Sequence, residues 1–383
     1  MTLPGENATA WMASPMMLLV VVPLAAGAGW LLTRGVAAIV EFLPADARRH
    51  RTVWGMTILA AVALWWWEVV LGSQLPVGIA TTDSATLGLR YLAHAILFLF
   101  LAAAAWVDLR HRVIPDAITV PGVLAGLGWN ACFPDTLLPI ARLLARSFAT
   151  PTVGLDVLGP AGGLTEPGLP AWLGSAPAVG GLAAAGLMFA VWWWAGTAPD
   201  DAPPEANTQA RRLPGPRLLI ALAGAGGIVA VWLVGVSHWA GLVTGLVGLT
   251  VAGGLIWATR LGASWALGRE AMGFGDVTLM AMAGAWLGWQ ACLLACLLAV
   301  FLGLAHGLSQ LLRHAESELP FGPSLCLGLV IVVVAWQRLW DAASPQFERP
   351  LELALVAGLV IGLTAITLWA WARLRTSTAA RRD

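Results

Sequence analysis

"EAMGFGDVTLMAMAGAWLG" (residues 270–288) begins as a glycine-broken loop and continues as an apolar helix of small residues. One carboxylate, Asp276, stands at the junction. Small side chains let a neighbouring helix pack closely, as is typical of helices in membranes. The apolar part, residues 277–289, is shorter than the about 20 residues that cross a bilayer. The stretch therefore predicts a tilted or half-inserted helix with an acid at its edge.

The rest of the chain is also apolar. Of its 383 residues, 59% are hydrophobic and 11% are charged, and the mean hydropathy is +0.79. Soluble domains carry about 25% charged residues. The composition therefore predicts an all-α, polytopic bundle of transmembrane helices. The net charge is zero, which gives no indication of a nucleic-acid partner.

Apolar stretches long enough to cross the membrane recur along the chain. The first lacks a basic segment before it, so we expect a retained span instead of a cleaved signal. Together with the short helix, the spans predict 10 to 11 crossings, with a turn at Ser237–His238 between the sixth and seventh. The candidate spans are residues 13–33, 53–72, 87–107, 113–133, 176–196, 218–236, 240–258, 290–310, 323–341 and 351–372.

The spans suggest three parts. Residues 1–95 hold N-terminal transmembrane helices, residues 96–341 form the main membrane domain, and residues 342–383 form a last helix and a basic tail. The main domain carries a loop rich in Pro and Gly at 134–175, expected outside the bilayer, and a polar linker at 197–216, expected to be flexible.

Arginine placement predicts the orientation. If the N-terminus is outside and the chain alternates, 16 of the 21 arginines fall inside, and the C-terminus is inside. Asp108 and Asp276 then both lie at the cytoplasmic boundary, although 168 residues separate them.

A structural interpretation of these two aspartates is available. Asp108 would be an interfacial residue beside arginines, and Asp276 would cap the helix that starts at Val277. Asp116, after Ile114–Pro115, is likewise placed to cap the next helix.

A chemical interpretation uses the two aspartates together. Two carboxylates held close together cannot both ionise easily, so they share a proton. The ionised one can take a proton from water while the protonated one donates to a carbonyl oxygen. Gly273 and Gly275 permit close backbone approach and unusual dihedrals beside Asp276. This chemistry needs no metal and no cofactor, and the sequence shows no metal-binding pattern.

Three motifs resemble one family, the type IV prepilin peptidases, which are membrane aspartic proteases of the GxGD type. Residues 270–288 resemble its GxGD motif. Residues 108–127, DLRHRVIPDAITVPGVLAGL, resemble its first aspartate motif. Residues 319–328, LPFGPSLCLG, are similar to its P-F-G-P segment. The resemblance covers roughly residues 100–133 and 240–341.

The resemblance implies that Asp108 and Asp276 are the catalytic pair. It implies a substrate as well: the basic leader and first apolar helix of a type IV prepilin or a type II secretion pseudopilin, cleaved at the cytoplasmic face of the bacterial inner membrane. The residues expected at the approaching peptide backbone are Gly273, Gly275, Pro115, Asp116, Pro320, Gly322 and Pro323.

Two departures from the family stand out. Thr278 replaces a usual Lys, so a substrate or structural contact differs. The bifunctional members carry an N-terminal cytoplasmic domain with paired CxxC motifs, linked to N-methylation. Here no cysteine precedes Cys132, and we expect a peptidase without methyltransferase activity.

Two alternatives remain open. A transporter or proton pathway could use the same acids together with Glu68, an intramembrane carboxylate. An inactive homologue in pilus assembly would keep the fold alone. His94 and His306 are further polar residues within spans. The four cysteines, Cys132, Cys292, Cys296 and Cys326, lie in apolar stretches and predict neither a disulfide framework nor a zinc site.

Overall fold

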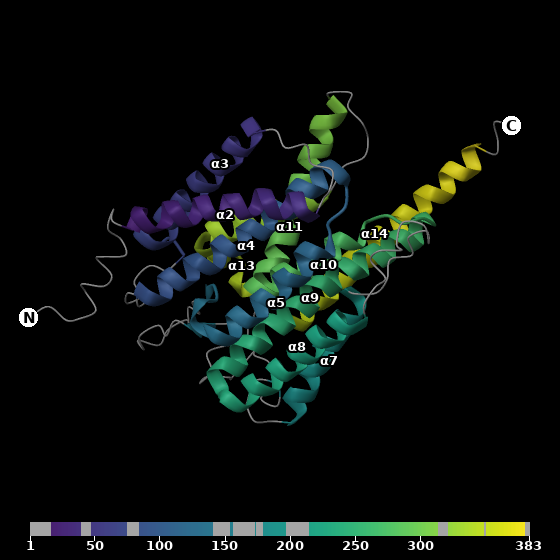
Figure 1. Cartoon of the computed structure of the whole chain (residues 1–383). Helices are drawn as coiled ribbons and strands as arrows, with labels where there is room; N and C mark the ends of the chain where they lie inside the picture. Colours follow the sequence, from purple (N-terminus) through teal and green to yellow (C-terminus); the bar gives the residue numbers. More distant parts are fainter. Residues whose placement is uncertain are drawn as a thin grey trace, which may run out of the picture.

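The computed structural model of the chain is a bundle of helices (Figure 1). It describes residues 17–39, 47–74, 84–140, 154–155, 173, 179–196, 214–312, 321–347 and 350–379. In this part of the chain the only strands are β1 (Pro139–Ile140) and β2 (Gly154–Leu155), which pair antiparallel with Pro139 opposite Leu155. The predicted all-α bundle of apolar helices is confirmed.

The helices follow the apolar stretches of the sequence closely. In chain order they are α2 (Leu18–Ile39), α3 (Ala47–Trp65), the π-helical turn η2 (Trp66–Val70), α4 (Ser84–His111), α5 (Asp116–Cys132), the 3-10 turn η3 (Pro134–Thr136), α7 (Val179–Gly196), α8 (Pro214–Val234), α9 (Val236–Leu267), α10 (Phe274–Leu287), α11 (Trp289–Leu312), α12 (Gly322–Val334), α13 (Trp336–Phe347) and α14 (Pro350–Ala379).

Four helices are long and apolar enough to cross a membrane by themselves, and the bent pair α12–α13 would make a fifth. The four are Ala85–His111, Val179–Gly196, His238–Leu267 and Trp289–His306. Five shorter apolar helices, α10 among them, also occur among the described residues. The number of 10 to 11 crossings and the orientation stay predictions.

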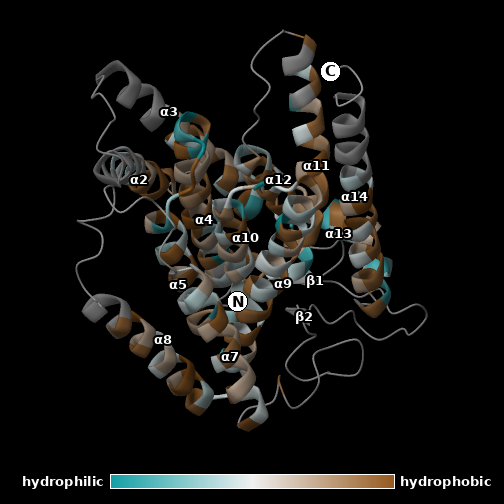
Figure 2. Cartoon of the chain, turned by 90° about the vertical axis from the view of Figure 1, so that its right-hand side faces the viewer, coloured by the Kyte–Doolittle hydropathy of each residue, from teal (hydrophilic) through white to brown (hydrophobic). Residues whose placement is uncertain are grey.

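Helix α10 lies in the middle of the bundle, among α4, α5, α9 and α12 (Figure 2). Its closest neighbour is α9. A side chain at Gly284 would overlap the backbone of Gly248, and one at Gly248 would overlap Gly284. The small residues of α10 therefore serve the packing of α9. Asp108 lies on α4, which also contacts α10 but less extensively than α9 does.

Helix α5 is joined to α10 by hydrogen bonds as well as by packing. The Trp286 indole donates to the Gly122 carbonyl over 2.8 Å, and the Asn130 amide donates to the Ala285 carbonyl over 2.8 Å. A side chain at Gly122 would collide with Met282. The α5–α9–α10 unit thereby fixes the loop that precedes α10.

The structure places two helix breaks, one inside a candidate span and one two residues before the expected turn. The span expected at 323–341 is broken after Val334, and α12 and α13 meet at 96°. Polar residues such as Gln337 and Asp341 follow the break, so α13 is amphipathic and does not continue the apolar path of α12. The turn between α8 and α9 falls at Gly235, not at Ser237–His238, because only glycine readily adopts its φ of 149°.

Within the loop expected at 134–175, the described residues include η3 and both short strands. The part of the linker at 197–213 lies outside the described residues.

The N-terminal helices pack around a small core of their own. Its buried members are Val21, Leu64, Trp65 and Tyr91, and it is separate from the main core around α10. Tyr91 belongs to α4, so this small core joins α2 and α3 to α4.

Candidate active site

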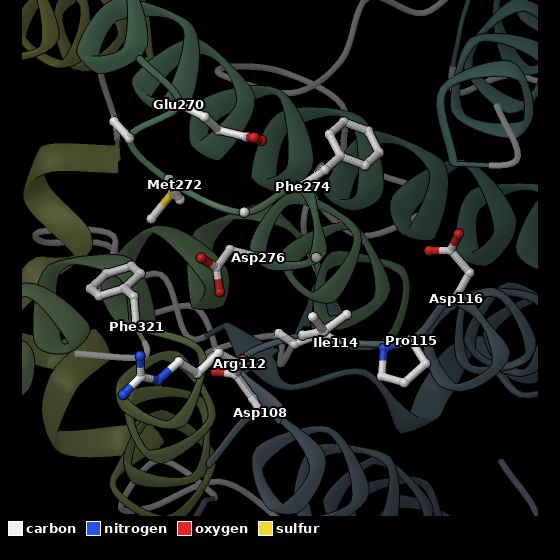
Figure 3. Close-up of a pocket in the computed structure, with 14 residues that line it drawn as sticks. Asp108, Arg112, Ile114, Pro115, Asp116, Glu270, Met272, Phe274, Asp276 and Phe321 are labelled. Atoms are coloured by element: carbon white, nitrogen blue, oxygen red, sulfur yellow. The ribbon is translucent and has the colours of Figure 1, made fainter. Parts of the chain in front are cut away.

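A cavity of about 490 Å³ lies where the α4–α5 turn meets the loop before α10 (Figure 3). It brings together six of the residues that the sequence singled out. Its lining consists of Asp108, Arg112, Val113, Ile114, Pro115, Asp116, Glu270, Ala271, Met272, Gly273, Phe274, Gly275, Asp276 and Phe321. Asp108 and Asp276 therefore share one hollow despite their distance in sequence.

Asp276 lies inside α10 and not at its cap. The helix begins at Phe274 with Gly273 as its N-cap residue, and no side chain caps it. Asp276 is the third helical residue and is 8% exposed. The interpretation of Asp276 as an N-cap is wrong, since the helix starts three residues earlier than the sequence suggested.

Asp108 lies in the last turn of α4 and is 6% exposed. The backbone N–H of Gly322, the first residue of α12, donates a hydrogen bond to it. The carboxylate thus accepts one of the free N–H groups at a helix N-terminus, where the helix dipole favours negative charge. Asp276 is close enough to Asp108 for the two carboxylates to interact electrostatically.

The turn after α4 places Ile114 against the GxGD loop. Arg112 adopts a φ of 57°, and its N–H donates to the Asp108 carbonyl over 2.8 Å. This left-handed residue reverses the chain at the end of α4. A side chain at Gly275 would collide with Ile114, so Gly275 is required for contact inside the protein.

The expectation of unusual dihedrals at the two motif glycines is wrong. Gly273 has a φ of −64°, and neither it nor Gly275 has a positive φ. A side chain at Gly273 would meet only the Gly275 nitrogen, at 4.0 Å, and Gly273 lines the cavity.

Arg260 of α9 holds the loop before α10, a role that the sequence did not reveal. Its Nε donates to the Met272 carbonyl over 2.9 Å, its Nη2 pairs with Glu270, and its guanidinium lies 5.7 Å from the centre of the Phe274 ring. An arginine inside a long apolar helix was the available signal, since such a charge needs partners.

The remaining expected site residues take different places. Pro115 is the N-cap residue of α5, and Asp116 is the first helical residue, so Asp116 does not occupy the cap position. Asp116 is exposed and lies apart from the two buried aspartates in Figure 3. Pro323 is the second residue of α12, after Gly322, and it is not among the cavity-lining residues. Pro320 lies outside the described residues.

Thr278, found where the family usually has Lys, is buried and donates its hydroxyl hydrogen bond to the Gly275 carbonyl over 3.0 Å. A charged side chain would have to be buried at this position, whereas the Thr hydroxyl finds a partner within its own helix.

The other polar suspects lie away from the cavity. Glu68 accepts a 2.7 Å hydrogen bond from His94, and both side chains are buried. His306 is half-buried on α11.

All four cysteines are free thiols. Within the described ranges, no group of three His, Cys, Asp or Glu side chains is arranged to hold a metal ion.

Comparison with known proteins adds an independent observation. Residues 209–308 match the Type IV leader peptidase family. The matched segment contains Asp276 and Arg260 but stops short of Gly322 and does not reach back to Asp108. Together with the apolar helices, the match supports a protein that crosses a membrane several times.

Several curated relatives carry the name prepilin leader peptidase/N-methyltransferase. That of Escherichia coli K12 is 38% identical over 113 residues, which is 26% of this chain and 50% of the relative. That of Stutzerimonas stutzeri is 32% identical over 149 residues, which is 32% of this chain and 51% of the relative. That of Aeromonas salmonicida is 37% identical over 89 residues, 22% of this chain and 29% of the relative. The chain thus spans about half or less of these relatives. No solved structure matches it.

Proposed function

We propose that this chain, whose residues 209–308 belong to the Type IV leader peptidase family, is a membrane aspartic endopeptidase that removes leader peptides from prepilins or pseudopilins. One observation carries the proposal. Asp108 and Asp276, both buried, line a single cavity between the α4–α5 turn and the loop before α10.

In this mechanism the two carboxylates divide general base and general acid catalysis between them. The ionised aspartate takes a proton from water, and the water oxygen bonds to the scissile carbonyl carbon. The protonated aspartate donates its proton to the carbonyl oxygen. When the C–N bond breaks, the aspartate that took the proton from water donates it to the leaving amine. The former carbonyl oxygen returns its proton to the other aspartate. The pair therefore ends with one shared proton, as it began.

We assign the ionised role to Asp108. It accepts the Gly322 N–H at the N-terminus of α12, and both the hydrogen bond and the helix dipole stabilise a carboxylate more than a neutral acid. Asp276 then holds the proton, because a second negative charge beside Asp108 is unfavourable.

The charge of the cavity suits the basic leader of a prepilin. Besides the catalytic pair, the lining has two more carboxylates, Asp116 and Glu270, against one guanidinium, Arg112. Because Glu270 is paired with Arg260, the mouth keeps only a small excess of negative charge, which favours the approach of a basic peptide without depending on either carboxylate. The arginine distribution of the sequence places this mouth at the cytoplasmic face.

Purified protein in detergent, incubated with a synthetic prepilin, tests the proposal. We expect mass spectrometry to find a free leader that ends at the glycine before the mature N-terminus. A metal chelator should leave the rate unchanged, because the proposed chemistry uses carboxylates and water alone. An intact prepilin after prolonged incubation with correctly inserted protein would reject the proposal.

A further inference from the structure

A second buried polar cluster lies far from the cavity, in the N-terminal part of the chain. Glu68 is its centre. Its Oε1 accepts hydrogen bonds from His94 over 2.7 Å and from the Gln74 amide over 2.8 Å, and all three side chains are at most 3% exposed. We call these residues the Glu68 cluster. Glu68 belongs to the π-helical turn η2, a rare element that is frequent at functional sites.

The Glu68 cluster is joined to the end of α12. Gln74 donates a second hydrogen bond to the Val333 carbonyl over 3.0 Å, and the Trp67 indole donates to the Val334 carbonyl over 2.6 Å. Because α12 ends at Val334, these carbonyls have lost their partners in the next helical turn. Unpaired carbonyls are costly in a bilayer. The 96° bend takes away the backbone N–H groups that would otherwise donate to these two carbonyls. Trp67 and Gln74, from the N-terminal part of the chain, replace them with side-chain donors.

The opposite end of α12 carries Gly322, whose N–H is bonded to Asp108. The 12 residues from Gly322 to Val333, separated by 11 helical steps, correspond to a rigid rod of about 16 Å. A shift of α12 along its axis would move both ends together. The length of α12 thus connects the Glu68 cluster to the proposed catalytic carboxylate.

We propose that the Glu68 cluster and Trp67 are positioning residues, which fix the register of α12 and thereby hold the Gly322 N–H on Asp108. This inference rests on the proposed peptidase function. It also gives the N-terminal helices, which lie outside the family match, a part in catalysis.

The residues between the two polar sites favour positioning over proton transfer. His94 and Asp108 lie on one face of α4, about 21 Å apart. The positions between them on that face are Leu97, Leu101 and Ala104, each at most 1% exposed. An apolar stripe of this kind transmits packing and offers no hydrogen-bonding group to relay a proton.

The first experiment compares cleavage kinetics of two variants. Gln74→Leu keeps the volume and removes both donor bonds, and Trp67→Phe is a milder change that removes only the indole donor. We expect kcat to fall about tenfold or more, as small displacements of catalytic groups do, with KM changed less than twofold because no cavity-lining residue is altered. Tyr91→Phe is the matched control: it removes a hydrogen bond to the Ala61 carbonyl in the same region without touching α12, and it should cleave normally.

The second experiment separates geometry from charge. Glu68→Gln keeps an oxygen that can accept from both His94 and Gln74, so cleavage should stay within about threefold of the wild type, whereas Glu68→Leu should match Gln74→Leu. If Glu68→Gln is as damaging as Glu68→Leu, the charge or proton of Glu68 is used and the positioning proposal is wrong.

A readout independent of activity monitors α12 itself. Cys326 of α12, a helix that packs against α4, is 5% exposed. Its alkylation by a maleimide, mapped by mass spectrometry, should be slow in the wild type and in Tyr91→Phe, and faster in Gln74→Leu and Trp67→Phe. Normal kcat and a protected Cys326 in both variants would overturn the proposal. Failure of the wild type to cleave would instead reject the proposed function, and the alkylation rates would still test the positioning.

Discussion

The Oδ2 atom of Asp108 lies directly against Gly322, so that any side chain at position 322 would overlap the carboxylate. The same glycine donates its N–H to Asp108. One residue of α12 therefore leaves room for a carboxylate of α4 and also hydrogen-bonds it. Gly322 therefore contacts Asp108 of the proposed catalytic pair, whereas the sequence predicted that it would contact the substrate.

Replacement of Gly322 should therefore damage catalysis through Asp108. For Gly322→Ala we expect cleavage to fall about 100-fold, the scale of a 1 Å misplacement of a reacting group, while the protein still accumulates in the membrane. The control is Gly303→Ala on α11, where a methyl group would make only an ordinary contact, 3.5 Å from the Phe321 ring. Equal rates for the two variants would show that the Asp108–Gly322 contact is irrelevant to the reaction.

Asp108→Asn and Asp276→Asn should each abolish leader cleavage, because an amide can neither take a proton from water nor donate one as an acid. Asp116→Asn should stay within about threefold of the wild type, since Asp116 is exposed and lies apart from the pair. The three rates are measured on membranes with equal amounts of inserted protein. A loss in Asp116→Asn as large as the other two would mean that the first catalytic aspartate is misassigned.

Arg260→Met should loosen the loop that carries Met272 and Glu270. A hydrogen bond from a charged donor is worth about 1.5–3 kcal/mol, so we expect cleavage to slow about tenfold or more and limited proteolysis to cut more readily near the loop. Glu270→Gln is the matched control. Its ion pair with Arg260 is largely exposed, and such pairs contribute at most about 1 kcal/mol, so this variant should behave nearly as the wild type. If Glu270→Gln slows cleavage more than Arg260→Met does, the loop is held by the Arg260–Glu270 ion pair and not by the hydrogen bond from Arg260 to the Met272 carbonyl.

Gly284→Ala should destabilise the bundle itself. The added methyl group would overlap the Gly248 backbone at the α9–α10 contact, and overpacking of this kind typically costs about 1–3 kcal/mol. A lower Tm in detergent is the expected result. The control is Gly254→Ala. Gly254 lies on α9, as Gly248 does, but faces open space, so this variant should leave the Tm unchanged or slightly raised. An unchanged Tm in Gly284→Ala would contradict the close crossing of α9 and α10.

The sequence by itself determined the class of the molecule and singled out the two aspartates of the proposed catalytic pair. Long apolar stretches with few charges leave no alternative to helices in a membrane, because every backbone polar group must be paired within its own segment. The aspartate motifs around Asp108 and Asp276 are local patterns that can be read along the chain. Helix ends were less well predicted, since the start of α10 at Phe274 depends on backbone geometry that the pattern does not encode.

Only the tertiary structure decided how the two aspartates come to share a cavity. It did so through contacts between residues far apart in sequence: Gly275 with Ile114, Gly322 with Asp108, and Arg260 with the loop before α10. It also showed that the small residues of α10 serve α9, and that Trp67 and Gln74 pair the carbonyls left free at the bend after α12. Residue type and spacing indicate that a group needs a close neighbour or a hydrogen-bond partner, but which segment supplies it depends on how all the helices pack at once.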